Sequence, residues 1–318
     1  MNFKISIAFS IFILSMNSFA LNRLNPSIEK IEKLMKTVAS KNNPASYILN
    51  TSARVLAFNT QSIARLYRKE ESNLSKVYKD YKKLEDLIGG VKKWKEILDY
   101  AVANGASNSK IKNLQQNLES SERILNDFLK QGWLDQSIFK IHYEKTSFLD
   151  DLSDEQEREL TLSLVVKSLN KFDRTKFDLS YLEHGDGLHE FRRELRWQIY
   201  NVVNLGGLID YKRNVFSCSL VSFDKESLTK INKYTKITKI FNEESCLIDY
   251  CLINEIALMV SHFGVIKDEV EGYLNTIGIN DDRTPAAYYE RAISLELEWE
   301  NKNVISTLVG QLNQCQSN

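Results

Sequence analysis

Apolar residues recur at helical spacing along most of the 318-residue chain, and the alternation typical of strands is weak. Only three prolines and twelve glycines interrupt this pattern, which favours long helices. The pattern predicts helices over 26–36, 45–69, 72–88, 91–103, 110–130, 160–170, 188–205, 225–241, 246–263, 266–273 and 285–311. The predicted fold class is therefore all-α, in two antiparallel helical bundles.

Two features divide this helical pattern. The helix over 72–88 is expected to stop at the pair Gly89-Gly90, because glycine weakens a helix interior and favours its end. Between 144 and 160 the composition becomes acidic and polar, and we interpret this stretch as a linker. It separates an N-terminal helical half, 21–143, from a C-terminal half, 161–318.

The first twenty residues are typical of a secretory signal peptide. Lys4 gives a positive start, 5–16 is mostly apolar, and Ser18-Phe19-Ala20 is a small-x-small cleavage site. This predicts an exported protein, periplasmic or secreted, whose signal 1–20 is removed. A retained N-terminal anchor is the alternative, although the uncharged stretch is at or below the usual spanning length of ~20 residues.

Charge is balanced overall but uneven along the chain. Forty-two Lys and Arg oppose 42 Asp and Glu, so total charge does not indicate a nucleic-acid binder. Between 192 and 239, however, ten basic residues face four acidic ones, whereas 243–300 holds thirteen acids against three bases. A neutral total is compatible with a basic groove in an acidic body.

Cysteine and histidine placement gives no metal signature. The four cysteines are Cys218, Cys246, Cys251 and Cys315, without CxxC spacing or histidines at ligand spacing. Buried apolar thiols are the simplest interpretation, and disulfides are the alternative in an exported chain. We expect no metal and no cofactor.

The helix over 188–205 carries two adjoining stripes, one apolar and one cationic. At ~100° per residue, the cationic stripe is about 100° wide. Its residues are His189, Arg192, Arg193, Arg196 and Tyr200. Guanidinium groups bind phosphate oxygens through charge-assisted hydrogen bonds, so this face is a candidate anion site. The simpler alternative is a solvated face on which Glu190 pairs with Arg193.

Other basic residues are candidates to extend such a site. They are Arg54, Lys82, Lys83, Lys236 and Lys239. Lysines recur at every third position from 230 to 239, which spreads them over half of a helix circumference. A solvated face is therefore the alternative for that series.

The two halves share a weak pattern. Residues 81–89, from Tyr81 to Gly89, parallel residues 234–242, from Tyr234 to Asn242. Both segments end on a residue that tolerates the left-handed conformation closing a helix. This predicts a pseudo-twofold repeat, although apolar spacing alone also produces such matches between unrelated helices.

The cationic helix resembles the signature of the CHAD domain, the conserved-histidine α-helical domain, roughly H-x-x-R-x-x-x-(R/K)-R-x-R-Y. His189, Arg192, Arg196 and Tyr200 match it, while Trp197 and Ile199 replace expected basic residues. An earlier copy lines up at 51–55. There Arg54 matches, whereas Thr51, Phe58, Asn59, Gln61 and Ser62 depart from the pattern. Residues 84–89 also resemble the family's second helix ending, L-x-D-x-L-G.

This resemblance implies two four-helix bundles related by a pseudo-twofold axis, with a basic groove that binds inorganic polyphosphate. The chain also has no nucleophile motif or phosphate-cradling glycine loop, which favours a binding protein over an enzyme. We expect a non-enzymatic module that binds polyphosphate or another polyanion. The alternative is a cell-envelope protein-interaction scaffold that has lost the anion site.

Overall fold

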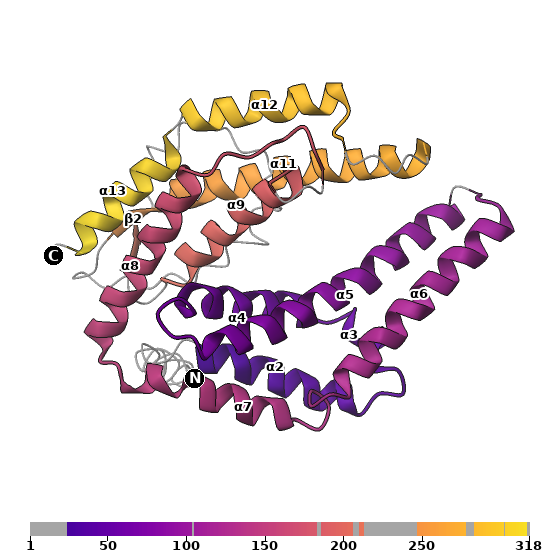
Figure 1. Cartoon of the computed structure of the whole chain (residues 1–318), viewed down its shortest axis with the longest axis horizontal. Helices are drawn as coiled ribbons and strands as arrows, with labels where there is room; N and C mark the ends of the chain where they lie inside the picture. Colours follow the sequence, from indigo (N-terminus) through magenta and orange to yellow (C-terminus); the bar gives the residue numbers. More distant parts are fainter. Residues whose placement is uncertain are drawn as a thin grey trace, which may run out of the picture. The chain divides into compact units, whose positions relative to one another are not determined.

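Helices dominate the protein, which confirms the all-α class (Figure 1). The structure is a computed structural model that describes residues 24–103, 105–182, 186–205, 210–212, 247–277, 283–301 and 303–316. The chain divides into two compact units, Met1–Glu157 (unit 1) and Arg158–Asn318 (unit 2). The division falls within the acidic stretch 144–160, and each unit is described by itself.

Unit 1 is built on a four-helix bundle. Its elements are α2 (Leu24–Ala39), α3 (Pro44–Ile48), α4 (Ala53–Tyr67), α5 (Leu74–Ala103), α6 (Asn108–Leu129), α7 (Ser137–Thr146) and a short 3₁₀ helix, η1 (Ser147–Asp151). Helix α2 packs on α4, α4 on α5, α5 on α7, and α7 on α2, so these four helices enclose one core. Ile31, Tyr81 and Phe139 are buried in it, as the helical spacing of apolar residues requires.

Helices α5 and α6 form a long hairpin beside this bundle (Figure 1). The base of α6 is attached to α3 through Asn126. Its side-chain oxygen accepts from the Ala45 amide at 2.9 Å, and its amide nitrogen donates to Asn43 Oδ1 at 3.2 Å. Asn43 also caps α3, so one polar cluster orients both helices.

Unit 2 is also helical. Helix α8 (Asp154–Asp173) starts in the last residues of unit 1 and is followed by α9 (Leu188–Val203), α11 (Tyr250–Ile277), α12 (Ala286–Asn301) and α13 (Val304–Gln316). Two short strands, β1 (Asp210–Lys212) and β2 (Leu247–Asp249), pair in parallel. The Phe191 ring of α9 lies 4.7 Å from that of Phe263 and 5.9 Å from that of Phe172, so α8, α9 and α11 share an aromatic core.

Two predicted helix breaks at glycines are wrong. Helix α5 runs through Gly89-Gly90, and α11 runs through Gly264, where the sequence pattern separated 246–263 from 266–273. Gly89 and Gly264 each face an arginine of a neighbouring helix, whereas nothing lies within 4 Å of a Cβ built on Gly90. The missing side chain therefore serves tertiary packing and not helix termination.

Other boundaries also differ from the prediction. The segment 45–69 forms two helices, α3 and α4, and 285–311 divides into α12 and α13 at Asn303, whose φ is 52°. The acidic stretch 144–160 is mostly helical, comprising the end of α7, η1 and the start of α8. The predicted helix 225–241, with Lys236 and Lys239, lies outside the described residues, as does the signal peptide.

Cys251 and Cys315 are both disulfide-bonded, contrary to the simplest interpretation of the sequence as buried free thiols. Among the helices that the structure describes, none is long and apolar enough to cross a membrane.

Helix α12 contains a carboxyl group that weakens unit 2 at high pH. Burial, together with the charge of Glu300 one turn away, raises the pKa of Glu296 to about 7. The unfolded chain ionises nearer 4.5, so stability falls as pH rises from about 4.5 through about 7. Glu296→Gln should therefore increase the free energy of unfolding at pH 8 by about 1 kcal/mol after solvent screening, and by much less at pH 4.5.

Thermal denaturation at the two pH values measures this difference. Glu290→Gln, an exposed change on the same helix, is the matched control. A gain for Glu296→Gln of equal size at both pH values, or an equal gain for the control, would show that ionisation of Glu296 is not the cause.

Candidate functional site

Helix α9 presents the cationic face because its opposite side is fixed in the core. Its apolar stripe is buried as predicted, including Leu188, Phe191, Leu195, Ile199 and Val202. Two backbone hydrogen bonds hold its start: Leu188 N donates to Tyr181 O at 2.9 Å, and His189 N donates to Leu182 O at 3.0 Å. The rotation of the helix is thereby set.

The predicted anion-binding residues of α9 divide into two groups. His189, Arg192, Arg193 and Arg196 are half-buried, so they lie along the boundary between the packed side and the solvent. Tyr200 is only 8% exposed and belongs to the core. The cationic face therefore ends at Arg196 and is one turn shorter than the sequence indicates.

Arg192 is held against α11 at a glycine. Its Nε donates to the Val260 carbonyl oxygen at 3.3 Å. A Cβ placed on Gly264 would lie 3.0 Å from that Nε and 3.2 Å from Nη2. The guanidinium thus lies flat on the helix surface, in a space that any other residue at 264 would narrow.

Arg54 packs over a glycine of unit 1 in a similar way, but its acceptor is a side-chain carboxylate and not a backbone carbonyl. Its Nε donates to Glu85 Oε1 of α5 at 2.8 Å, and a Cβ on Gly89 would lie 2.9 Å from Nη2. Glu85 stands four residues before Gly89, as Val260 stands four residues before Gly264. In each unit the arginine Nε therefore donates to a residue four positions before a glycine, and the guanidinium packs over that glycine.

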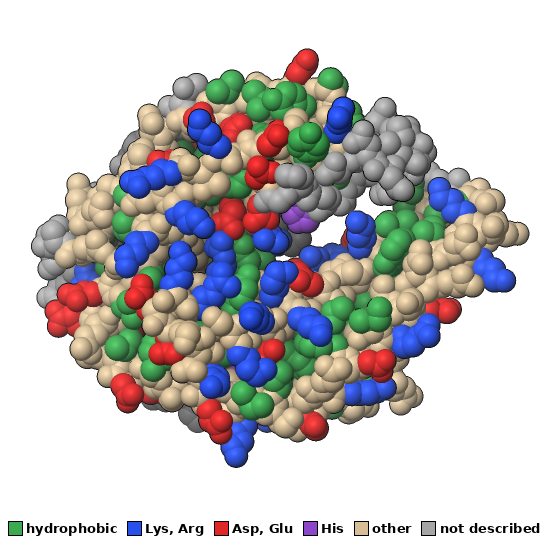
Figure 2. Space-filling view, in the orientation of Figure 1, with side chains coloured by type: hydrophobic (Ala, Val, Ile, Leu, Met, Phe, Trp, Pro, Cys, Tyr) green, Lys and Arg blue, Asp and Glu red, His purple; other side chains and the backbone are tan. Residues whose placement is uncertain are grey.

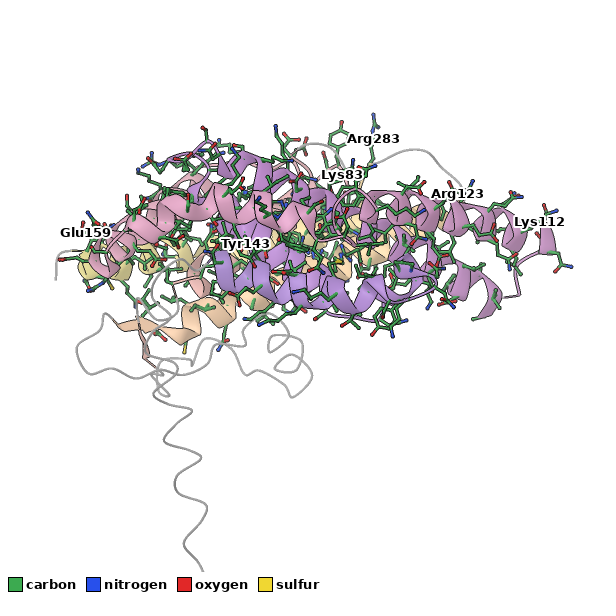
Figure 3. The ribbon with its side chains drawn as sticks, turned by 90° about the horizontal axis from the view of Figure 1, so that it is seen from below. Lys83, Lys112, Arg123, Tyr143, Glu159 and Arg283 are labelled. Atoms are coloured by element: carbon green, nitrogen blue, oxygen red, sulfur yellow. The ribbon has the colours of Figure 1, made fainter. Side chains whose placement is uncertain are left out.

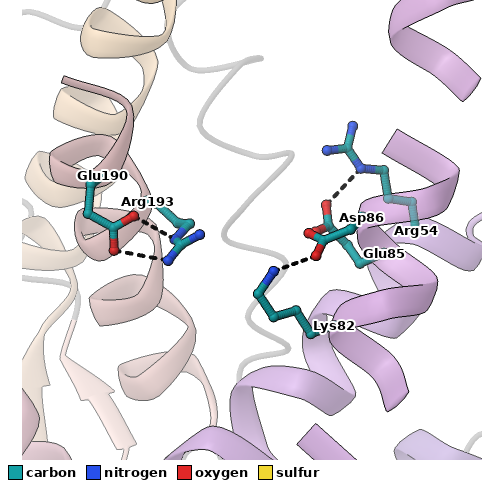
Figure 4. A network of polar contacts seen from close by, with 6 residues as sticks. All are labelled: Arg54, Lys82, Glu85, Asp86, Glu190 and Arg193. Atoms are coloured by element: carbon teal, nitrogen blue, oxygen red, sulfur yellow. Dashed lines mark hydrogen bonds and ion pairs between the residues drawn. The ribbon is translucent and has the colours of Figure 1, made fainter. Parts of the chain in front are cut away.

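Carboxylates neutralise several of the predicted cations (Figure 4). Arg54 pairs with Glu85, and Lys82 pairs with Asp86 one turn along α5. On α9 the Arg193–Glu190 pair is double, with Nε and Nη2 each 3.0 Å from a carboxylate oxygen. These pairs lower the local positive potential. Figure 2 likewise shows acidic side chains among the basic ones.

Lys83 has a different environment. Its Nζ lies 5.0 Å from the centre of the Phe128 ring of α6, which is cation–π distance. Within unit 1, Arg54 and Lys82 both contact acidic residues of the same stretch of α5, but Lys83 points to α6. The three predicted residues therefore do not form one cluster of like charge.

Sequence reasoning missed the residues that set this geometry, namely Gly89, Gly264 and Glu85. The Lys82–Asp86 pair was visible as an i,i+4 spacing. The contact of Arg54 with Glu85 joins residues 31 positions apart and has no local signal.

A second polar group lies inside unit 1. His142 is fully buried, and its Nε2 lies 3.0 Å from Asp80 Oδ2, which also binds Lys76 at 3.1 Å. Burial, with a smaller contribution from the charge of Lys76, lowers the pKa of His142, although Asp80 acts in the opposite direction. Burial also opposes ionisation of Asp80, but the hydrogen bonds from His142 and Lys76 prevail, so the pKa of Asp80 is lowered. His142 is therefore a neutral donor to a carboxylate.

In the described parts of the chain, no cluster of three or more His, Cys, Asp or Glu side chains has the arrangement of a metal site. Comparisons of the chain with family models, curated proteins and solved structures found no match. The site is therefore interpreted from its own geometry.

Proposed function

We propose that the protein is an exported, CHAD-like helical module that binds inorganic polyphosphate or another polyanion through arginines of α9 and α4. The main support is the recurrence of one arrangement, an arginine anchored on a helix beside a glycine, at Arg54 and Arg192. These two residues occupy the same position in the two copies of the sequence motif.

The anchored arginines suit a phosphate ligand. In each case Nε, Cζ and Nη2 are the atoms nearest the glycine, so the guanidinium packs over it. Because packing already fixes the side chain, binding costs less conformational entropy than it would for a mobile arginine. Charge-assisted bonds from guanidinium to phosphate oxygens are among the stronger hydrogen bonds.

The same arrangement supports the pseudo-twofold repeat. It makes α4 and α5 the counterparts of α9 and α11, with Gly89 corresponding to Gly264. Three residues after each glycine stands a lysine, Lys92 or Lys267. This register differs from the predicted pairing of 81–89 with 234–242, and 234–242 lies outside the described residues.

Export has independent support from Cys251 and Cys315. Both are disulfide-bonded, and disulfides persist mainly in oxidising compartments such as the periplasm or the extracellular space. The signal-like sequence of residues 1–20 points to the same location.

Binding should depend on Arg192 and on salt. Loss of one charge-assisted contact costs about 1.5–3 kcal/mol, which is roughly a 10- to 150-fold loss of affinity. Arg192→Ala/Arg196→Ala should therefore bind long-chain polyphosphate at least about tenfold more weakly than the wild type. Affinity of the wild type should also fall as salt concentration rises, because each phosphate contact releases counterions. Fluorescence anisotropy with labelled polyphosphate measures both effects.

Arg291→Ala is the matched control in unit 2, because Arg291 is exposed and pairs with Glu269 away from α9. Arg54→Ala tests unit 1, with exposed Arg123→Ala as its control. Circular dichroism checks that helicity is unchanged. Equal binding by Arg192→Ala/Arg196→Ala and the wild type, or no binding by the wild type at low salt, would refute the proposal.

The neutralising ion pairs favour a second candidate function. Glu85, Asp86 and Glu190 each bind a cation of the predicted site, which is the arrangement expected if the scaffold has been retained and its anion site lost. In that case the protein is a cell-envelope interaction scaffold. Absence of polyphosphate binding at low salt, together with recovery of a specific envelope protein by crosslinking, would favour it.

A further inference from the structure

Few of the residues that the structure describes pack on the distal part of the α5–α6 hairpin. We define the distal arm as residues 91–103 of α5 and 108–123 of α6. Helix α4 begins beside Gly89, where Arg54 packs, and runs back along α5 to Tyr78, whose ring lies 4.0 Å from the Arg68 guanidinium. The arm lies beyond this contact. Figure 3 shows Lys112 near its end and Arg123 closer to the bundle.

Few apolar side chains of the arm are buried. Those below 10% exposure are Val91, Ala101 and Leu114. Trp94 and Leu98 are half-buried, and Val102 is 55% exposed. Because these three residues follow one another at i, i+4 and i+8, they form one stripe along α5. Figure 2 shows hydrophobic side chains in the region where Figure 1 places the distal end of α5.

Charged residues on one side of this stripe indicate which partner covers it. Lys95 and Asp99 are exposed and lie about 60° and 100° round the helix from Leu98, on the same flank. Neither forms an ion pair or hydrogen bond within the described part of the chain. A helix that pairs along this flank should therefore place an acidic residue beside Lys95 and a basic residue beside Asp99.

A second copy of the arm, placed antiparallel to the first, has that order. When a two-fold axis at Leu98 relates the two copies, Trp94 of one lies opposite Val102 of the other, so the two apolar stripes face each other. This arrangement also brings Lys95 of one copy within a helical turn of Asp99 of the other, twice by symmetry. Two-fold symmetric interfaces of this kind are the commonest in homo-oligomers. We propose that the arms of two copies of this chain pair antiparallel along α5 to form a dimer.

Charge exchange tests the pairing on the full chain, with sedimentation velocity at increasing protein concentration as the readout. Lys95→Glu alone and Asp99→Lys alone each create two like-charge contacts and should raise the dimer dissociation constant at least about fivefold. Lys95→Glu/Asp99→Lys should restore wild-type dimerisation, as should an equimolar mixture of the two single variants. Failure of both restorations would overturn the antiparallel register.

The apolar stripe is tested with a matched pair of exposed residues. Val102→Lys should convert the dimer to monomer, whereas Tyr100→Lys should not, because Tyr100 is 69% exposed and lies on the opposite side of α5. Both variants should keep wild-type helicity by circular dichroism. A wild-type chain that stays monomeric throughout the concentration range, or a dimer that Val102→Lys leaves intact, would refute the proposal.

Discussion

Replacing Trp133 with alanine should lower the free energy of unfolding of unit 1 by about 3–5 kcal/mol. Trp133 is fully buried in the turn between α6 and α7. Its ring lies 5.3 Å from that of Tyr81 and 5.7 Å from that of Phe139, both edge-on, and 5.8 Å from that of Phe128. Alanine would leave a cavity where α5, α6 and α7 meet, and urea denaturation followed by circular dichroism measures the loss.

Ile124→Ala is the control. Ile124 lies on α6 outside the distal arm and is 55% exposed, so its truncation should cost about 1 kcal/mol or less. Because the chain forms two compact units, the data should be fitted with separate transitions for units 1 and 2. Similar losses for Trp133→Ala and Ile124→Ala would contradict the packing described for unit 1.

Sequence reasoning identified the features that depend on local spacing. The start of α9 at Leu188, its buried stripe and its cationic side all follow from the 3.6-residue period. The Glu190–Arg193 pair also follows from spacing alone, as i,i+3 neighbours. Tyr200 is misplaced by the spacing because every side chain from Trp197 to Val202 is buried, so the last turns of α9 are covered on all sides and not only along the apolar stripe.

Glycine was misinterpreted because its role depends on a partner distant in sequence. Gly89 and Gly264 have the residue type of a helix end, yet each lies inside a helix of about thirty residues, α5 (30) or α11 (28). The favourable packing of a guanidinium in the space left by the missing Cβ offsets the entropic cost of ~1 kcal/mol for glycine in a helix. That partner, Arg54 or Arg192, cannot be inferred from propensity.

Buried polar pairs were also invisible to sequence reasoning. His142 and Asp80 lie 62 residues apart, and Arg54 and Glu85 lie 31 apart, on different helices in both cases. Neither pair has a motif spacing. No local pattern in the sequence therefore marks His142 as fully buried. Long-range polar contacts require the packing to be known first.

Mild acid should destabilise unit 1 through His142. Burial and the nearby charge of Lys76 hold the pKa of His142 below its ordinary value of 6.5, against the opposite effect of Asp80. As pH falls through about 6.5, the unfolded chain takes up a proton that folded His142 does not, so stability falls with decreasing pH. The fall is at most ~1.4 kcal/mol per pH unit for one proton, and it ends when pH passes below the lowered pKa of the folded state.

Asp80, which accepts a hydrogen bond from His142, causes a second loss of stability at lower pH. Asp80 accepts from His142 and Lys76, and its lowered pKa means that its stabilising contribution is present above about 3.8 and is lost as pH falls further. Chemical denaturation between pH 7.5 and 4.5 measures the loss of stability caused by His142 separately from that caused by Asp80. In this pH range His142→Gln should reduce the pH dependence of the unfolding free energy of unit 1. His189→Gln, which replaces a half-buried side chain of α9 in unit 2, should leave that dependence unchanged. An equal slope in His142→Gln and the wild type would assign the acid sensitivity to other groups.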